Sequence, residues 1–139
     1  MSLLIDTDII IFSIKENEFV KRGFLENESL PKSISIITYG ELLHGAKKSK
    51  YPDKNLPTIY RIAEIFPIIP ITRAIIETFT DLKLILEKDG SIIEDFDLLI
   101  ASTAITYNYT LVTNNKKHFD RIKGLKIENW YRNEFHNPG

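Results

Sequence analysis

The stretch Leu3-Leu4-Ile5-Asp6-Thr7-Asp8-Ile9-Ile10-Ile11 decides how the chain is expected to fold. Its first three residues are apolar with no polar alternation, which predicts a short strand buried on both faces in a parallel sheet flanked by helices. Ligands of such sheets bind beyond the carboxyl ends of the strands, where Asp6 would lie. Asp8 could simply cap the helix that follows. Asp6 is enclosed by apolar residues, and because an unpaired buried carboxylate is costly, we expect it to be functional.

The composition is that of an ordinary globular protein. The chain has 139 residues, of which 43% are hydrophobic and 27% charged, so we expect one domain over residues 1–139. The net charge of -1 gives no general attraction to nucleic acids, so RNA binding would need a local basic patch. The lack of Cys excludes disulfides, cysteine zinc sites and thiol catalysis. Because neither a signal peptide nor an apolar run of about 20 residues is apparent, we expect a cytoplasmic protein without membrane spans.

Strand and helix patterns alternate along the whole chain. Short apolar runs predict strands at residues 3–5, 33–37, 67–71, 109–113 and 124–127. Helical periodicity predicts helices at residues 9–14, 18–27, 38–48, 54–66, 72–88 and 94–105, and a short one near 119–122. Such alternation indicates an α/β fold with three layers, α/β/α, around a central, mostly parallel sheet of about five short strands.

Three acidic residues are expected at one edge of this sheet. Asp6 ends the first strand, Glu41 lies in the first turn after the second strand, and Asp97 lies in the first turn of the buried helix. Carboxylates about 4 Å apart repel by about 4 kcal/mol at an effective dielectric constant of 20, so without a cation one of them would be driven to protonate. A divalent cation removes the conflict, and an all-oxygen site suits Mg²⁺ or Mn²⁺.

Each of these acids, and each polar residue near them, also has a purely structural explanation. Glu41 could be the last member of a capping box that begins at Thr38. Asp97 could merely complement the helix dipole, a contribution of about 0.3–1 kcal/mol. Thr113 and Asn114 follow the fourth strand and could orient a water molecule or a phosphate.

Four segments of the chain resemble a known family. They are LLIDTDIII (3–11), SIITYGELLHGAKKS (35–49), DFDLLIASTAITYNYTLVTNN (95–115) and HFDRIKGLKIENW (118–130). In this order and spacing, the chain resembles PIN-domain proteins and, more closely, the VapC-type toxins of bacterial and archaeal toxin–antitoxin pairs. The resemblance implies a Mg²⁺- or Mn²⁺-dependent endoribonuclease that cuts structured RNA such as tRNA or rRNA. It also implies a homodimer that is inhibited by a cognate VapB-like antitoxin.

Carried over by motif, the acidic cluster of the family corresponds to Asp6, Glu41 and Asp97. In this hypothesis Asp6 and Asp97 bind the metal directly, and Glu41 binds it directly or through water. Thr7, Thr113 and Asn114 would position water or phosphate. RNA would meet local lysines, namely Lys47, Lys48, Lys50, Lys116 and Lys117.

The chain departs from the family pattern at two places. Asp8 stands where Asn is common, which adds a carboxylate near the metal. A fourth acid often falls before Phe119, but here His118 occupies that position and the nearest acid, Asp120, lies beyond Phe119. These departures concern whether a second metal ion binds, and they do not change the expectation of a first one.

Two other functions fit part of the sequence. Asp6 and Asp8 form the Asp-x-Asp pattern of haloacid-dehalogenase-like phosphatases, in which Asp6 would be a phosphorylated nucleophile. That chemistry also needs a late acidic pair, which the chain lacks. The other alternative is a degenerate PIN domain that binds RNA or a partner without catalysis, and divalent-metal binding discriminates between it and a nuclease.

Overall fold

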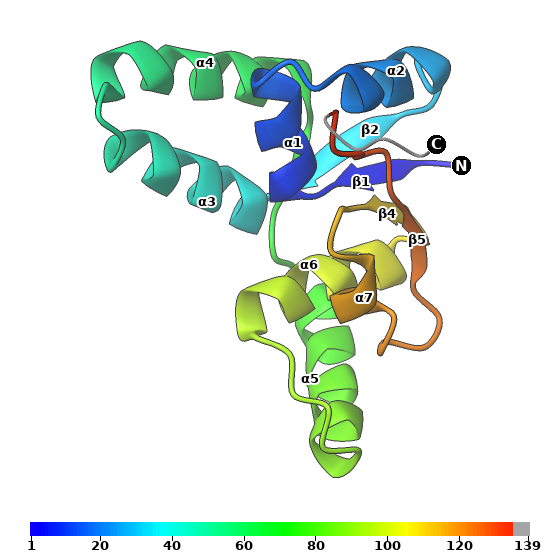
Figure 1. Cartoon of the computed structure of the whole chain (residues 1–139). Coiled ribbons are helices and arrows are strands. Elements are labelled where there is room, and N and C mark those ends of the chain that lie inside the picture. Colours follow the sequence, from blue (N-terminus) through cyan, green and yellow to red (C-terminus); the bar gives the residue numbers. More distant parts are fainter. Residues whose placement is uncertain (135–139) are drawn as a thin grey trace.

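Five short parallel strands form the centre of the structure, a computed structural model that describes residues 1–134 (Figure 1). Their order in the sheet is β3-β2-β1-β4-β5, and every neighbouring pair is parallel. The strands are β1 (Leu3–Ile5), β2 (Lys32–Ser35), β3 (Ile68–Ile69), β4 (Thr110–Val112) and β5 (Lys126–Glu128). The predicted parallel α/β sheet is therefore confirmed.

Helices cover both faces of the sheet. They are α1 (Thr7–Ile14), α2 (Glu18–Glu26), α3 (Ile36–Lys47), α4 (Pro52–Ile65), α5 (Arg73–Lys88), α6 (Asp95–Thr106) and α7 (Lys116–Phe119). Figure 1 shows α1, α2 and the hairpin of α3 and α4 on one side of the sheet, and α5, α6 and α7 on the other. None of the helices in residues 1–134 is long and apolar enough to cross a membrane.

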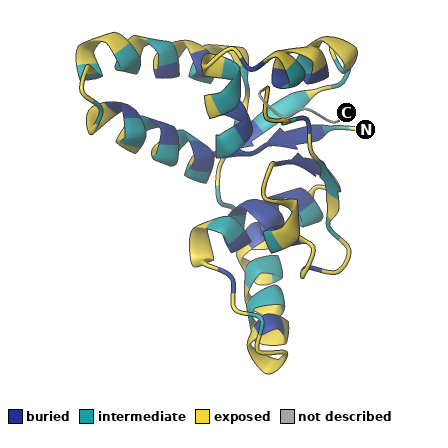
Figure 2. Ribbon diagram, viewed as in Figure 1, coloured by how far each residue is buried: buried dark blue, intermediate teal, exposed yellow. Residues whose placement is uncertain are grey.

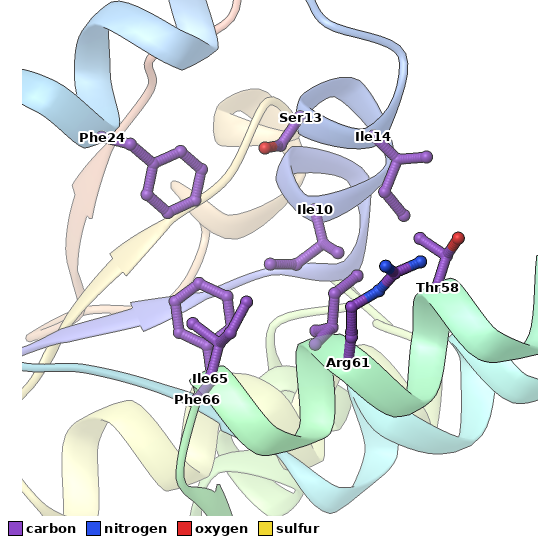
Figure 3. A pocket seen from close by; sticks show the side chains of 9 residues that line it. Ile10, Ser13, Ile14, Phe24, Thr58, Arg61, Ile65 and Phe66 are labelled. Atoms are coloured by element: carbon purple, nitrogen blue, oxygen red, sulfur yellow. The ribbon is translucent and has the colours of Figure 1, made fainter.

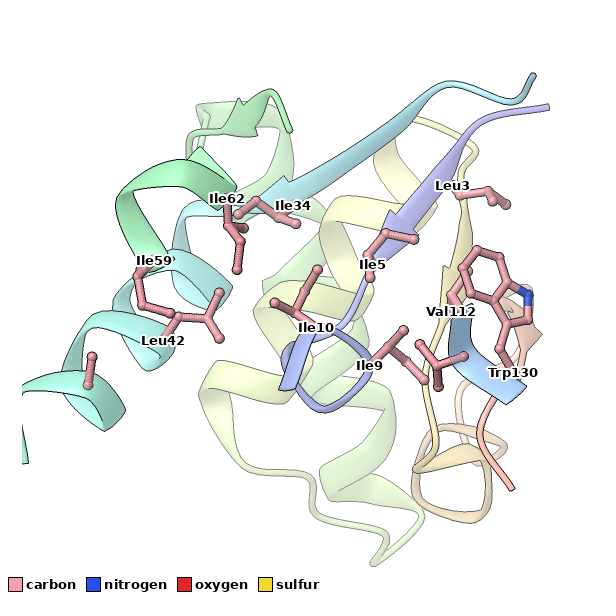
Figure 4. Close-up of a cluster of buried hydrophobic side chains, with 12 residues drawn as sticks. Leu3, Ile5, Ile9, Ile10, Ile34, Leu42, Ile59, Ile62, Val112 and Trp130 are labelled. Carbon is pink, nitrogen blue, oxygen red and sulfur yellow. The ribbon is translucent and has the colours of Figure 1, made fainter. Parts of the chain in front are cut away.

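The central strand β1 contributes side chains to both halves of the core. Leu3 and Ile5 enter the cluster under α1, α2 and α4 (Figure 4), whereas Leu4 enters the cluster under α5, α6 and α7. All three are fully buried, as the dark strand in Figure 2 shows. This follows from the alternation of side chains along a strand. Each such side chain contributes roughly 1.5–3 kcal/mol by burial, so the apolar run of β1 holds the three layers together.

The boundary between β2 and α3 differs from the prediction. The second strand ends at Ser35, and Ile36 and Ile37 belong to the helix. The Ser35 side chain accepts a hydrogen bond of 3.0 Å from the backbone N–H of Ile37 and so caps the helix. The predicted capping box of Thr38 and Glu41 is therefore wrong, because the real cap lies three residues before Thr38. Glu41 consequently lies in the second helical turn and not in the first.

The first helix also begins earlier than expected. It starts at Thr7, and its N-cap is Asp6, whose Oδ1 accepts from the backbone N–H of Thr7 at 2.8 Å. Asp8 lies inside the first turn, so the alternative that Asp8 caps this helix is wrong. The long helix α5 is capped by Thr72, whose Oγ1 accepts from the N–H of Ile75 at 3.3 Å.

The C-terminal segment closes one half of the core with Trp130. Its ring lies edge-on to Phe24 with 5.0 Å between ring centroids, and its Nε1 donates to Glu128 Oε1 at 2.9 Å. The ring sits directly over Gly23 in α2, where a Cβ atom would overlap it. Glycine is thus required at position 23 by close packing.

The substitution Gly23→Ala should destabilise the protein by about 1–3 kcal/mol, because the added methyl group must displace the ring of Trp130. Chemical denaturation with unfolding followed by tryptophan fluorescence measures this change. Gly45→Ala is the matched control, since it also lies inside a helix but its Cβ would meet nothing within 4 Å. That control should be stabilised by up to about 1 kcal/mol. Equal effects at the two positions would contradict the packing argument.

Candidate active site

The starts of α1, α3 and α6 meet at the edge of the sheet where the strands end (Figure 1). Because β1 pairs with β2 on one side and β4 on the other, the segments that follow these three strands are neighbours. Asp6 follows β1, α3 with Glu41 follows β2, and Thr113 follows β4. Asp97 reaches the same edge from the first turn of α6.

Asp6 is the most deeply buried of the acids, with an exposed fraction of 7%. Its Oδ1 accepts from the N–H of Thr7, and its Oδ2 accepts from the hydroxyl of Thr113 at 2.7 Å. Burial raises the pKa of Asp6 from 3.8 to about 7, and the carboxylates of Asp8 and Asp97 add to the rise against these two hydrogen bonds. A proton or a cation is therefore favoured at this carboxylate near neutral pH.

Asp8 belongs to the same cluster. Its Oδ2 accepts from the backbone N–H of Asn114 at 3.1 Å, whereas its Oδ1 is buried and has no hydrogen-bond partner in residues 1–134. Burial raises the pKa of Asp8, and the nearby charge of Asp97 adds to this. An orphaned buried carboxylate oxygen costs free energy, and a hard cation is a partner that would satisfy it.

Glu41 is held by a hydroxyl from another helix. Its Oε1 accepts from Thr7 Oγ1 at 2.7 Å, and Thr7 Oγ1 lies 3.1 Å from the hydroxyl of the fully buried Thr38. The single hydroxyl proton of Thr7 is therefore shared between the carboxylate of Glu41 and the hydroxyl of Thr38, and the carboxylate is the nearer acceptor. Burial raises the pKa of Glu41, and Asp97 adds to the rise while the hydrogen bond from Thr7 lowers it.

The charge of Asp97 acts on all three of the other acids, because it raises the pKa of Asp6, Asp8 and Glu41. Its Oδ2 lies 3.3 Å from Nε2 of His118, which comes from α7. The prediction from sequence did not include this contact, although it noted that His118 stands in the position of an acid. The prediction from sequence assigned Thr38 only to a capping box, whereas its contact with Thr7 depends on the packing of α3 against α1.

The structure therefore brings the predicted acids to one edge but gives each of them a separate partner. Within residues 1–134, no three His, Cys, Asp or Glu side chains already converge as they would around a single ion. The chemistry of the set is nevertheless that of a divalent-metal site, because it offers only hard oxygen donors, raised pKa values and one orphaned oxygen. The residues present thus fit a Mg²⁺ or Mn²⁺ ion.

The predicted basic residues lie on two helices and the turn after one of them. Lys47, Lys48 and Lys50 are exposed around the end of α3, and Lys116 and Lys117 are exposed in α7. Lys48 and Glu41 line the same cavity of about 660 Å³. Its other walls include the exposed ring of Phe96, which precedes Asp97 in α6.

A second cavity lies away from this chemistry. It is an open pocket with a volume of about 320 Å³ and is lined by α1, α2, α4 and Phe66, which follows α4, as Figure 3 shows. Its lining is almost entirely apolar, with the guanidinium of Arg61 at one side. None of the clustered acids lines it, so it is separate from the candidate active site.

The comparisons with known proteins agree with this arrangement. The PIN domain family model matches residues 3–125. The ribonuclease VapC1 of Methanocaldococcus jannaschii is 39% identical over 90% of this chain and 85% of its own length. The tRNA(fMet)-specific endonuclease VapC of Salmonella typhimurium is 33% identical over 94% of this chain and 98% of its own length.

A solved toxin–antitoxin complex shows the same fold. The chain superposes on one from the crystal structure of VapBC2 from Rickettsia felis, bound to a DNA fragment from their promoter, with a TM-score of 0.88. The two are 34% identical, and the match covers 94% of this chain and all of the other. These findings leave no support for a haloacid-dehalogenase-like phosphatase. The chain belongs to the PIN-domain family, as a VapC-type ribonuclease toxin.

Proposed function

We propose that this ribonuclease depends on one divalent cation, Mg²⁺ or Mn²⁺, held by Asp6, Glu41 and Asp97. The observation that carries the proposal is the buried carboxylate of Asp6, whose pKa is raised to about 7 beside two further carboxylates. A fold does not keep such a costly group without a partner for it. The family is typically metal-dependent, which supports the proposal.

The hydroxyls around the acids have distinct tasks in this proposal. Thr113 donates to Asp6 Oδ2 and Thr7 donates to Glu41 Oε1, so both carboxylates are held at the sheet edge before a cation arrives. Asp8 lends further negative charge, and its Oδ2 holds the backbone of Asn114 in place. When bound, the cation supplies a polarised water and offsets the charge that builds on the scissile phosphate.

Glu41 is the acid best placed to take a proton from that water. Its side chain is only half-buried, it lines an open cavity, and its pKa is raised by burial and by Asp97. A carboxylate with a raised pKa is a stronger base than an ordinary one. Asn114, exposed just beyond Thr113, would orient the water or the phosphate.

The substrate in this proposal is a structured RNA, with tRNA as the first candidate. The relative from Salmonella typhimurium carries the name of a tRNA(fMet)-specific endonuclease. The exposed lysines at the end of α3 and in α7 would bind phosphates of the backbone, and one of them, Lys48, lines a cavity together with Glu41. Their contribution should weaken as salt concentration rises, because phosphate contacts release condensed cations.

The partners in this proposal are a cognate VapB-like antitoxin and a second copy of the chain. Related structures contain toxin–antitoxin complexes, including VapBC from Salmonella typhimurium at 30% identity and a TM-score of 0.88. That complex supports the antitoxin as a partner. The homodimer follows from the family resemblance, and a second copy would cover apolar side chains that a single chain leaves exposed.

Purified protein with Mn²⁺ or Mg²⁺ should cleave an initiator tRNA transcript, and EDTA should abolish cleavage. Asp6→Asn should lower the cleavage rate by about a hundredfold or more, because the neutral amide is a poorer metal ligand at the buried position. Gel analysis of RNA fragments over time measures both effects. Asp81→Asn, an exposed carboxylate on α5, is the matched control and should cleave at the normal rate.

Two results would contradict the proposal. Cleavage that survives both EDTA and Asp6→Asn would show that the activity does not use this site. Metal binding without cleavage of any RNA would favour a domain that binds RNA or a partner without catalysis.

The stability of the metal-free protein should fall as the pH rises from about 4 to 7. The folded chain keeps a proton on Asp6 up to a pKa of about 7, whereas the unfolded chain releases it near 3.8. The folded state thus binds more protons in this window, and raising the pH through it removes roughly 2–4 kcal/mol. Thermal unfolding of chelated protein across this range measures the loss.

The asparagine variant tests the origin of this pH dependence. Asp6→Asn cannot ionise, so its melting temperature should change less between pH 4 and 7 than that of the unaltered protein. Because the cation competes with the same proton, Mg²⁺ should raise the melting temperature more at pH 8 than at pH 5. A stabilisation by Mg²⁺ that is the same at both values would argue against binding at Asp6.

A further inference from the structure

A series of polar contacts connects Arg121, His118 and Asp97 at the edge of the acidic cluster. Nη2 of Arg121 lies 2.8 Å from Nδ1 of His118, and Nε2 of His118 lies 3.3 Å from Oδ2 of Asp97. The Nε2 atom is buried and lies within hydrogen-bond reach of Asp97 Oδ2, although the two groups are not aligned as a hydrogen bond in this structure. Among residues 1–134 the atom has no hydrogen-bond partner, and the acid that faces it is Asp97, whose carboxylate the proposed cation would use.

Arg121 determines which nitrogen of the imidazole carries the proton. A guanidinium only donates hydrogen bonds, so Nδ1 of His118 must be the acceptor. In a neutral imidazole the proton then lies on Nε2, facing Asp97. The guanidinium is itself held in place, because Nε donates to the carbonyl of His118 at 3.2 Å and Nη1 donates to the carbonyl of Ile92 at 3.4 Å.

This tautomer excludes His118 from the ligands of a cation. A nitrogen that carries a proton has no lone pair in the ring plane for a metal ion. Ligation through Nε2 would require the proton on Nδ1, which would then face the N–H of Arg121. The imidazole can instead donate to Asp97 Oδ2 and leave Oδ1 of that carboxylate for the ion.

We propose that His118 is a positioning residue that orients the carboxylate of Asp97, in a tautomer that Arg121 imposes. The inference rests on the proposed function, in which Asp97 binds the divalent cation. In this role His118 donates a hydrogen bond to a carboxylate that binds the cation and thereby fixes the orientation of that carboxylate. It also assigns a task to Arg121, which touches none of the acids in this arrangement.

Nuclear magnetic resonance of the metal-free protein tests the tautomer directly. At pH 8, where an ordinary imidazole is neutral, the ¹⁵N spectrum should show His118 protonated on Nε2. The spectrum of His118→Gln identifies its signals among those of the three histidines. Arg121→Met should shift the Nδ1 signal, because that atom loses its donor. A His118 that is protonated on Nδ1 would overturn the inference.

Calorimetric titration with Mn²⁺ tests the positioning role. His118→Leu should weaken Mn²⁺ binding by about tenfold or more, because Asp97 loses its donor. His118→Gln should bind within about threefold of the unaltered protein, since its amide nitrogen can donate from the place of Nε2. Melting temperatures of the three metal-free proteins establish that each is folded at the temperature of the titration.

The outcomes separate this inference from the proposed function. If the unaltered protein binds Mn²⁺ and both variants bind equally well, the positioning role is overturned and the metal site stands. If both variants lose affinity equally, a donor at this position is not what matters and the role is again overturned. If the unaltered protein binds no Mn²⁺, the metal site is overturned, and the role of His118 toward it is overturned as well.

Discussion

The buried carboxylate of Asp6 is the constraint on which the rest of the site depends. The strand before it is apolar and fully buried, and the sheet order places it between the ends of two neighbouring strands. A carboxylate there is almost entirely removed from water, and it accepts instead from the N–H of Thr7 and the hydroxyl of Thr113. These donors do not offset the cost of burial, since the pKa of Asp6 remains raised to about 7. The charged form of Asp6 is therefore unfavourable without a partner, and a bound cation would offset this cost.

The other acids add to the electrostatic cost of burying carboxylates at this edge of the sheet. Asp8, Glu41 and Asp97 come from three helices, and the charge of Asp97 raises the pKa values of Asp6, Asp8 and Glu41, which is a net cost to folding at neutral pH. Asp6, Asp8 and Glu41 each accept from a neutral donor, and within residues 1–134 none of the four acids forms an ion pair with a lysine or arginine. An arginine at this place would neutralise the charge permanently. Neutral donors hold the carboxylates and leave their charge for a ligand.

The two halves of the core explain why these segments are held so firmly. The side chains of β1 alternate between the two clusters, so packing on both faces fixes the position of the strand. The packing of α6 through Leu98, Ile100, Ala101 and Ala104 fixes the first turn that carries Asp97. Rigid elements of this kind place a charged group more accurately than a loop does. The site is therefore built on the parts of the fold that are hardest to move.

The sequence by itself determined the fold class, the parallel order of strands and helices, and the acids that gather at one edge. It could do so because these features follow from local apolar patterns and from motifs in a fixed order. It failed at the start of α3, where the Thr-x-x-Glu spacing mimicked a capping box and Ser35 proved to be the cap. Only the tertiary structure decided the partners of the acids, because Thr7 and Glu41 are 34 residues apart and Asp6 and Thr113 are 107 apart. The same holds for His118, whose tautomer depends on an arginine and whose role depends on a carboxylate from a distant helix. No spacing rule predicts such contacts, since they arise from how strands are ordered in the sheet and helices are packed on it.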